Sequence, residues 1–172
     1  MRLKQFRTEL IDALDVDQAT RERLDELELW ELLLHYLSWR DRVVVPRPRQ
    51  IEVQDGFWSS SLSQKFSSQI SLLLGEIEKG ADIRPYLSDK IEKFSLPEPH
   101  PKKPNATDWR GRDFVLSVYD LHHLHLGERQ ANNQVKRSDH LLFIGFGRDV
   151  ARLICVDTHA AFFDGRMTEA AE

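Results

Sequence analysis

Residues 140–159 have the sequence HLLFIGFGRDVARLICVDTH. Apolar residues fill both ends of this stretch, and the three residues Gly-Arg-Asp at 147–149 separate them. A short polar break that contains glycine, between two runs rich in apolar residues, is typical of a tight turn. We therefore predict two strands, over residues 140–146 and 150–159, that form a hairpin.

Upstream of the hairpin, residues 114–126 read FVLSVYDLHHLHL. From Asp113 onward the period of the pattern changes to two, which predicts one long strand over these residues. A polar loop over residues 127–139 then leads into the hairpin. Together these segments make up the antiparallel β region that we predict over residues 113–165, and a tail follows over residues 166–172.

Residues 1–95 have a different pattern, in which apolar residues recur at steps of three and four. This spacing places them on one side of a helix. It predicts three long helices, over residues 3–14, 20–37 and 59–79, and a short one over residues 82–94. The glycine that follows the third long helix is typical of a helix C-terminus.

Two segments interrupt this helical region or follow it. Residues 39–53, WRDRVVVPRPRQIEV, contain two prolines and predict an extended segment or an edge strand. Residues 96–112 contain four of the seven prolines and predict a proline-rich basic arm. Helices first and strands later indicate an α+β fold, with N-terminal helices packed on a small C-terminal antiparallel sheet in one compact domain.

The helix predicted over residues 20–37 is apolar on nearly all sides. Asp17 is its candidate N-cap, and Thr20 is the alternative. A domain of this size has difficulty in covering such a helix, and exposed apolar patches mark interfaces. We therefore expect this helix to contact a second copy of the chain or another protein.

Composition limits the classes of function. The chain has 172 residues and a net charge of −4, which argues against a generally basic nucleic-acid coat but leaves room for a local basic face. The single cysteine, Cys155, excludes a disulfide scaffold and a cysteine-based zinc site. No apolar stretch reaches the roughly 18 residues of a membrane helix. We expect a cytoplasmic protein that has no membrane contact and no cofactor.

Five of the seven histidines lie in the predicted β region. Strand alternation places His123 and His125 on one face, which we expect to face solvent, and His159 or His140 within reach on a neighbouring strand. Imidazole suits proton transfer because its free pKa is about 6.5. RNA cleavage by the neighbouring 2′-OH needs a base, an acid and a cation for the phosphate. The catalytic residues that we predict are His123, His125, His140, His159 and Arg129.

Two other interpretations of these histidines stay open. In one, the His123-x-His125 pair binds a metal ion, and Asp157 or His159 completes the ligand shell. In the other, the histidines pack at a sheet edge with backbone partners and do no chemistry. No HExxH, HxHxDH or Asp-rich metal motif is present to favour the metal site.

Basic residues outside the β region suggest a surface for nucleic acid. Arginine forks match phosphates in a bidentate manner, and basic residues around an aromatic side chain suit single-stranded nucleic acid. The alternatives are an edge strand that its charges keep soluble and a solvated arm whose tryptophan enters the core. The nucleic-acid-binding residues that we predict are Arg47, Arg49, Lys102, Lys103, Trp109, Arg110 and Arg112.

The run LHHLHLGERQ at 121–130, followed by the hairpin of residues 140–159, resembles the RelE/ParE-type toxins of bacterial toxin–antitoxin systems. Those toxins have a strand that ends in a glycine and an arginine, and then an apolar hairpin that ends near a basic or histidine residue. The resemblance covers residues 113–163. It implies a small antiparallel sheet with helices on one side, cleavage of mRNA and a cognate antitoxin. The acidic charge and the helical first half of this chain depart from that family.

These observations predict a toxin-like, RNA-directed protein that acts as a metal-independent endoribonuclease through histidine acid–base catalysis. Its expected partners are RNA, a cognate antitoxin or other protein bound through helix 20–37, and a second copy of the chain. One alternative is a non-enzymatic interaction module that docks a partner on its leucine-rich helices. Another is a histidine-based, metal-dependent hydrolase.

Overall fold

The computed structural model places the chain in two compact units. The helical unit consists of Met1–Val43 with Asp89–Arg112, and the sheet unit consists of Val44–Ser88 with Asp113–Glu172. The structure describes residues 2–14, 16–87, 98–100, 103–108, 114–128, 130 and 135–162. The helices predicted in the first 95 residues are therefore divided between the two units.

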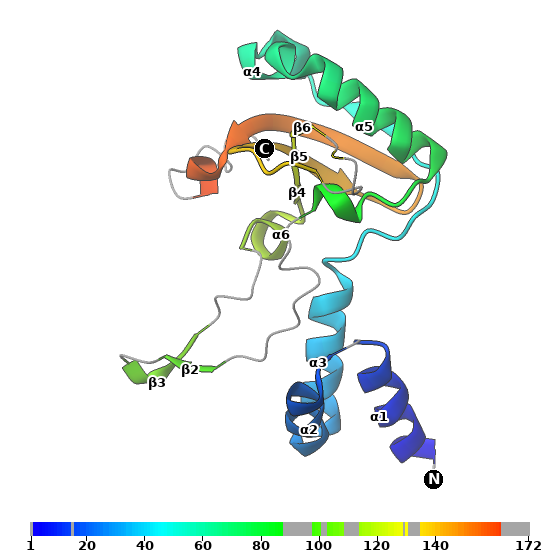
Figure 1. Ribbon diagram of the computed structural model, residues 1–172, viewed down its shortest axis with the longest axis vertical. Helices are drawn as coiled ribbons and strands as arrows, with labels where there is room; N and C mark the ends of the chain where they lie inside the picture. The colour runs from blue at the N-terminus through cyan, green and yellow to red at the C-terminus, as the bar shows by residue number, and fades with distance from the viewer. Residues whose placement is uncertain are drawn as a thin grey trace. The chain divides into compact units, whose positions relative to one another are not determined.

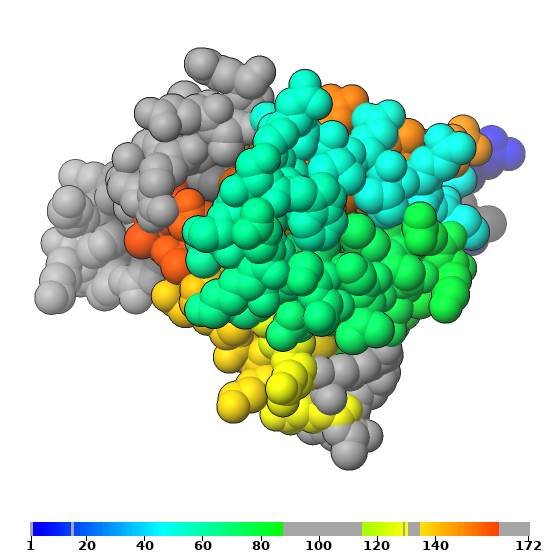
Figure 2. Space-filling view, turned by 90° about the horizontal axis from the view of Figure 1, so that it is seen from above, coloured from blue at the N-terminus to red at the C-terminus, as the bar shows by residue number. Residues whose placement is uncertain are grey.

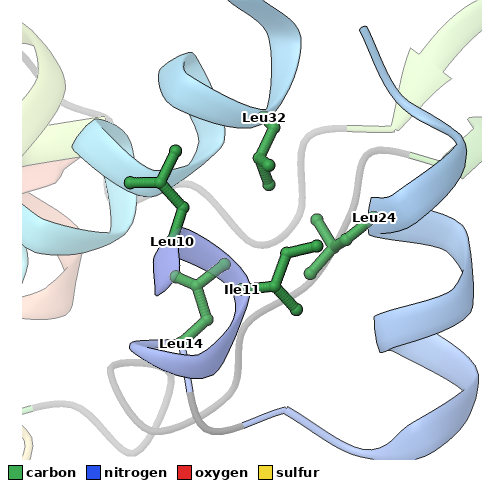
Figure 3. Packing of buried hydrophobic residues seen from close by; sticks show 5 residues of the cluster. All are labelled: Leu10, Ile11, Leu14, Leu24 and Leu32. Carbon is green, nitrogen blue, oxygen red and sulfur yellow. The ribbon is translucent and has the colours of Figure 1, made fainter. Parts of the chain in front are cut away.

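Three helices and a small hairpin form the helical unit. The helices are α1 (Arg2–Asp12), α2 (Gln18–Glu26) and α3 (Leu29–Arg40), and the antiparallel strands are β2 (Glu98–His100) and β3 (Lys103–Asp108). Aliphatic side chains from all three helices and from the turn after α1 meet in one buried cluster (Figure 3), namely Leu10, Ile11, Leu14, Leu24 and Leu32. Burial of this cluster stabilises the three helices, each of which is too short to be stable alone in water.

The prediction of a single helix over residues 20–37 is wrong, because two extended residues interrupt the helix between α2 and α3. Leu27 has extended backbone angles (φ −68°, ψ 151°), and so does Glu28 (φ −61°, ψ 150°). The predicted N-cap is confirmed, since Asp17 accepts a hydrogen bond from the Thr20 N–H at 2.8 Å. An aspartate in this position satisfies a helix donor that has no partner within the helix.

Polar contacts stabilise the interruption between α2 and α3 from both sides. The Glu31 carboxylate accepts the backbone N–H of Glu28 at 2.9 Å, as in a capping box, and this starts α3. The Arg7 guanidinium of α1 satisfies the end of α2 by donating to three backbone oxygens, those of Leu24, Asp25 and Leu27. A cation at a helix C-terminus also interacts favourably with the helix dipole.

The sheet unit contains a four-stranded sheet in the order β1-β6-β5-β4. The strands are β1 (Gln50–Val53), β4 (His122–His125), β5 (His140–Phe146) and β6 (Val150–Thr158). The predicted β5–β6 hairpin is confirmed, and β4 pairs antiparallel with β5. The three strands after Asp113 are therefore antiparallel, as predicted, and the fold is α+β. The four-stranded sheet is mixed, because β1 pairs parallel to β6. β1 comes from residues 39–53, which we call the Arg/Pro segment and which the sequence predicted to be extended or an edge strand.

The prediction of one long strand over residues 114–126 is wrong for the first half of this segment. Phe114–Tyr119 is a helix, α6, and Asp120 then takes a left-handed backbone conformation (φ 55°) before β4 starts. Val115 and Tyr119, four positions apart, pack into the same core cluster of the sheet unit. This spacing is typical of a helix, so tertiary packing overrides the apparent alternation of the sequence.

Helices lie on both sides of the sheet in Figure 1, with α4 (Ser61–Lys65) and α5 (Ser67–Lys79) on one side and α6 on the other. Figure 2 shows α4 and α5 spread over their face, with β6 visible only at the margins. On α5, Ile70, Leu73 and Ile77 are buried, at the steps of three and four residues that are typical of a helix. As expected, α5 ends at Gly80, whose φ of 73° favours glycine.

Short 3-10 turns complete the described elements, at Phe57–Ser59, Arg84–Tyr86 and His159–Phe162. The core between the sheet and α6 consists of Val115, Leu121, Leu141, Phe143 and Ala161. In the part of the chain that the structure describes, no helix is long and apolar enough to cross a membrane. The α6 core defines the sheet face on which the histidines lie.

Candidate functional site

Three histidines meet on the α6 face of the sheet. His123 and His125 of β4 lie opposite Phe143 and Leu141 of β5, which belong to the α6 core. His159 directly follows β6, and its ring centroid is 6.4 Å from that of His123 and 5.7 Å from that of His125. The rings of His123 and His125 are 6.3 Å apart. We call these three residues the histidine cluster.

The cluster is less open than the sequence predicts. His123 and His125 share a face, as expected, but only 9% and 5% of their surfaces are exposed, so the expectation that they face solvent is wrong. His159 remains the accessible member, with 43% of its side chain exposed.

The chain that follows β4 passes very close to the segment that leads into β5. A Cβ atom at Gly127 would lie 1.6 Å from the carbonyl oxygen of Lys136, so only glycine allows the chain to pass this closely. Lys136 also donates its N–H to the Glu128 oxygen at 2.9 Å. The chain itself therefore occupies the space that the missing Cβ leaves at Gly127.

Ser138 fixes the orientation of His125. His125 donates its Nδ1–H to the Ser138 carbonyl oxygen at 3.1 Å, because a carbonyl only accepts. Neutral His125 therefore keeps an unprotonated Nε2. Burial lowers the pKa of His125, and the nearby charges of His123, Arg137 and His159 lower it further, while the bond to Ser138 opposes this shift. His125 is thus a neutral imidazole with one nitrogen ready to accept a proton.

Asp139, the residue after Ser138, orients the third histidine. Its carboxylate lies 3.0 Å from Nδ1 of His159 and forms an ion pair when that imidazole is protonated. Because a carboxylate only accepts, it takes the Nδ1–H of His159, and this contact fixes the orientation of the ring. One short segment therefore holds two histidines through two different oxygen acceptors.

The remaining predicted catalytic residues do not join the cluster. His140 lies on the opposite face of the sheet, where its ring packs against Phe66 with centroids 4.6 Å apart. Arg129 lies outside the described residues. The exposed Arg137, which sequence reasoning missed, is near enough for its charge to lower the pKa of His125. Its signal was the polar Lys-Arg-Ser-Asp run directly before β5.

The two arginines predicted to bind phosphate contact the protein itself. Arg49 is buried, with its guanidinium carbon 5.2 Å from the centroid of the Phe146 ring. It donates to three carbonyl oxygens, those of Val45, Arg47 and Gly147. Arg47 forms an ion pair with Asp149 at 3.2 Å. Both therefore fasten the Arg/Pro segment to the β5–β6 turn, at the end of the hairpin away from His159.

In the basic arm, the structure describes only the two strands β2 and β3 of the helical unit. Lys103 is the first residue of β3 in the helical unit, and the other predicted members of the arm lie outside the described residues, namely Lys102, Trp109, Arg110 and Arg112. Within the ranges that the structure describes, no group of three or more His, Cys, Asp or Glu side chains is arranged to hold a metal ion.

No family model, curated protein or solved structure matches this chain.

Proposed function

We propose that the protein is a toxin-like, RNA-directed endoribonuclease that works without a metal ion. The proposal rests on one observation, the close approach of a buried imidazole, His125, to an accessible imidazole, His159, that faces a carboxylate. General acid–base catalysis needs one group that accepts a proton and one that donates it. The two rings are 5.7 Å apart, close enough for both to reach one reacting group.

In this mechanism, His125 is the general base and His159 the general acid. Nε2 of His125 takes the proton of the ribose 2′-OH, and the 2′-oxygen forms a bond to the adjacent phosphorus. The bond from phosphorus to the 5′-oxygen breaks, and His159 gives that oxygen its proton. The products are a 2′,3′-cyclic phosphate and a free 5′-OH, so no metal or redox partner is needed.

Two neighbouring groups support this assignment. Arg137 supplies a positive charge near His125, and a cation beside the phosphate stabilises the charge that develops in the transition state. The ring of His123 lies in contact distance of both proposed catalytic rings and restricts their positions. We assign His123 a positioning role.

The test is cleavage of RNA by the purified protein, with His125→Gln and His159→Gln as variants and His35→Gln of α3 as the matched control. We expect each cluster variant to lose about 10²–10⁴-fold in rate and the control to keep the wild-type rate. Activity should follow a bell-shaped pH profile, persist with a chelator and vanish on a 2′-deoxy substrate. Wild-type rates in both cluster variants would contradict the proposal, as would dependence on added metal.

A further inference from the structure

Helix α3 has two separate apolar faces. Its inner face carries Leu29, Leu32, Tyr36 and Trp39, which pack in or against the core of the helical unit. The residues of its outer face remain exposed, at 63% for Trp30, 37% for Leu33, 58% for Leu34 and 41% for Leu37. We call this second set the outer stripe. Its spacing of three and four residues places all four side chains along one line of the helix.

We propose that the outer stripe binds the outer stripe of a second copy of this chain, with the two helices antiparallel. The stripe is symmetric about the midpoint between Leu33 and Leu34, because Trp30 and Leu37 are equally far from it along the sequence. A two-fold axis at this midpoint places Trp30 of one copy against Leu37 of the other. Self-complementary surfaces of this kind form closed dimers.

Charge selects the antiparallel orientation. The N-terminal end of α3 and the residues before it are acidic, with Asp25, Glu26, Glu28 and Glu31. The C-terminal end carries two arginines and one acid, Arg40, Asp41 and Arg42. Antiparallel pairing places the acidic end of each copy beside the basic end of the other, whereas parallel pairing places the acidic ends together. Complementary charges favour the first arrangement and disfavour the second.

The size of the stripe sets the expected strength. A stable interface buries about 800 Å² per partner, and one aromatic side chain supplies about 150–250 Å² of that. Four partly exposed side chains supply less than the full area. We therefore expect a concentration-dependent dimer with a dissociation constant on the order of micromolar.

The first test is sedimentation of the wild type, Leu34→Lys and Leu72→Lys over a range of protein concentrations. Leu72 is the matched control, because it is a 72% exposed leucine on a helix of the other unit. We expect dimers for the wild type and Leu72→Lys, and at least tenfold weaker association for Leu34→Lys. Circular dichroism checks that each variant is folded. A monomeric wild type, or equal association by Leu34→Lys, would overturn the proposal and leave the stripe to a different partner.

The second test fixes the orientation by cysteine cross-linking in a Cys155→Ala background. In the antiparallel dimer, the two Trp30 residues of the two copies are about 10 Å apart along the helix axis. This is beyond the reach of a disulfide, which needs Cα atoms within about 7 Å. We expect Leu34→Cys to cross-link to itself. Trp30→Cys should cross-link only when it is mixed with Leu37→Cys. Self-cross-linking of Trp30→Cys would indicate a parallel pair and contradict the proposal.

Discussion

His125 makes the stability of the sheet unit depend on pH. Its pKa is about 6.5 in the unfolded chain and is lowered by burial in the folded protein. Between these two values the unfolded state binds more protons, so the free energy of unfolding decreases as the pH falls below about 6.5. The decrease levels off below the folded pKa, and above about pH 6.5 the stabilisation is complete.

We predict that His125→Gln removes this part of the pH dependence. The measurement is urea denaturation of the wild type and the variant at several pH values on both sides of the unfolded pKa. His35→Gln is the control, because it removes a histidine of the helical unit and should keep the wild-type slope. Identical slopes for the wild type and His125→Gln would show that the burial of His125 does not carry the effect.

Gly127 lets the chain after β4 lie directly against Lys136, two and three residues before the Ser138 and Asp139 that orient the histidine cluster. Gly127→Ala places a Cβ atom 1.6 Å from the Lys136 oxygen, so the segment carrying Ser138 and Asp139 must move. We expect a loss of about 1–3 kcal/mol in the free energy of unfolding. Gly75→Ala in α5 is the matched control, because a Cβ there meets nothing within 4 Å. It should stabilise the helix by about 0.5–1 kcal/mol. Equal effects of the two variants would contradict the proposed packing.

Among the helices, Arg7 of α1 caps the C-terminus of α2. Its guanidinium satisfies carbonyl oxygens at the end of α2, as the contact at 2.7 Å with the Leu27 oxygen shows. Arg7→Ala removes three donated hydrogen bonds, although the Leu24 oxygen still accepts the Leu27 N–H, and we expect a loss of about 1–3 kcal/mol in the free energy of unfolding. Lys4→Ala, an exposed cation on the same helix, is the control and should change stability by less than about 0.5 kcal/mol.

Elements with local signals were predictable from the sequence. The β5–β6 hairpin, the Asp17 cap and the end of α5 at Gly80 follow from interactions within a few residues of chain. The interruption between α2 and α3 contains neither proline nor glycine. It is stabilised in part by Arg7 of α1, which donates to the Leu27 oxygen. Periodicity alone does not reveal such a break. The same holds for α6, whose short pattern resembles strand alternation until its packing is known.

At the scale of the whole molecule, the two units have separate cores. Leu24 is buried in the helical unit and Leu142 in the sheet unit, both with 0% of their surface exposed. We predict that Leu24→Ala, which costs about 2–5 kcal/mol, raises hydrogen exchange in α1–α3 and leaves exchange in β5 unchanged. Leu142→Ala should give the reverse pattern. A uniform increase throughout the chain in either variant would mean that the units unfold together.

The sequence alone was enough to predict the hairpin, the end of α5 at Gly80 and the shared face of His123 and His125 on β4, although the single helix predicted over residues 59–79 is divided into α4 and α5 at Phe66. These outcomes depend on local turns and on the period of two in a strand. Only the tertiary structure decided that His159 joins them while His140 lies on the other face, because the face depends on strand register. It also decided that His125 is buried and that Ser138 and Asp139 orient the cluster. Those contacts join residues distant in the chain, and a local pattern carries no information about such pairs.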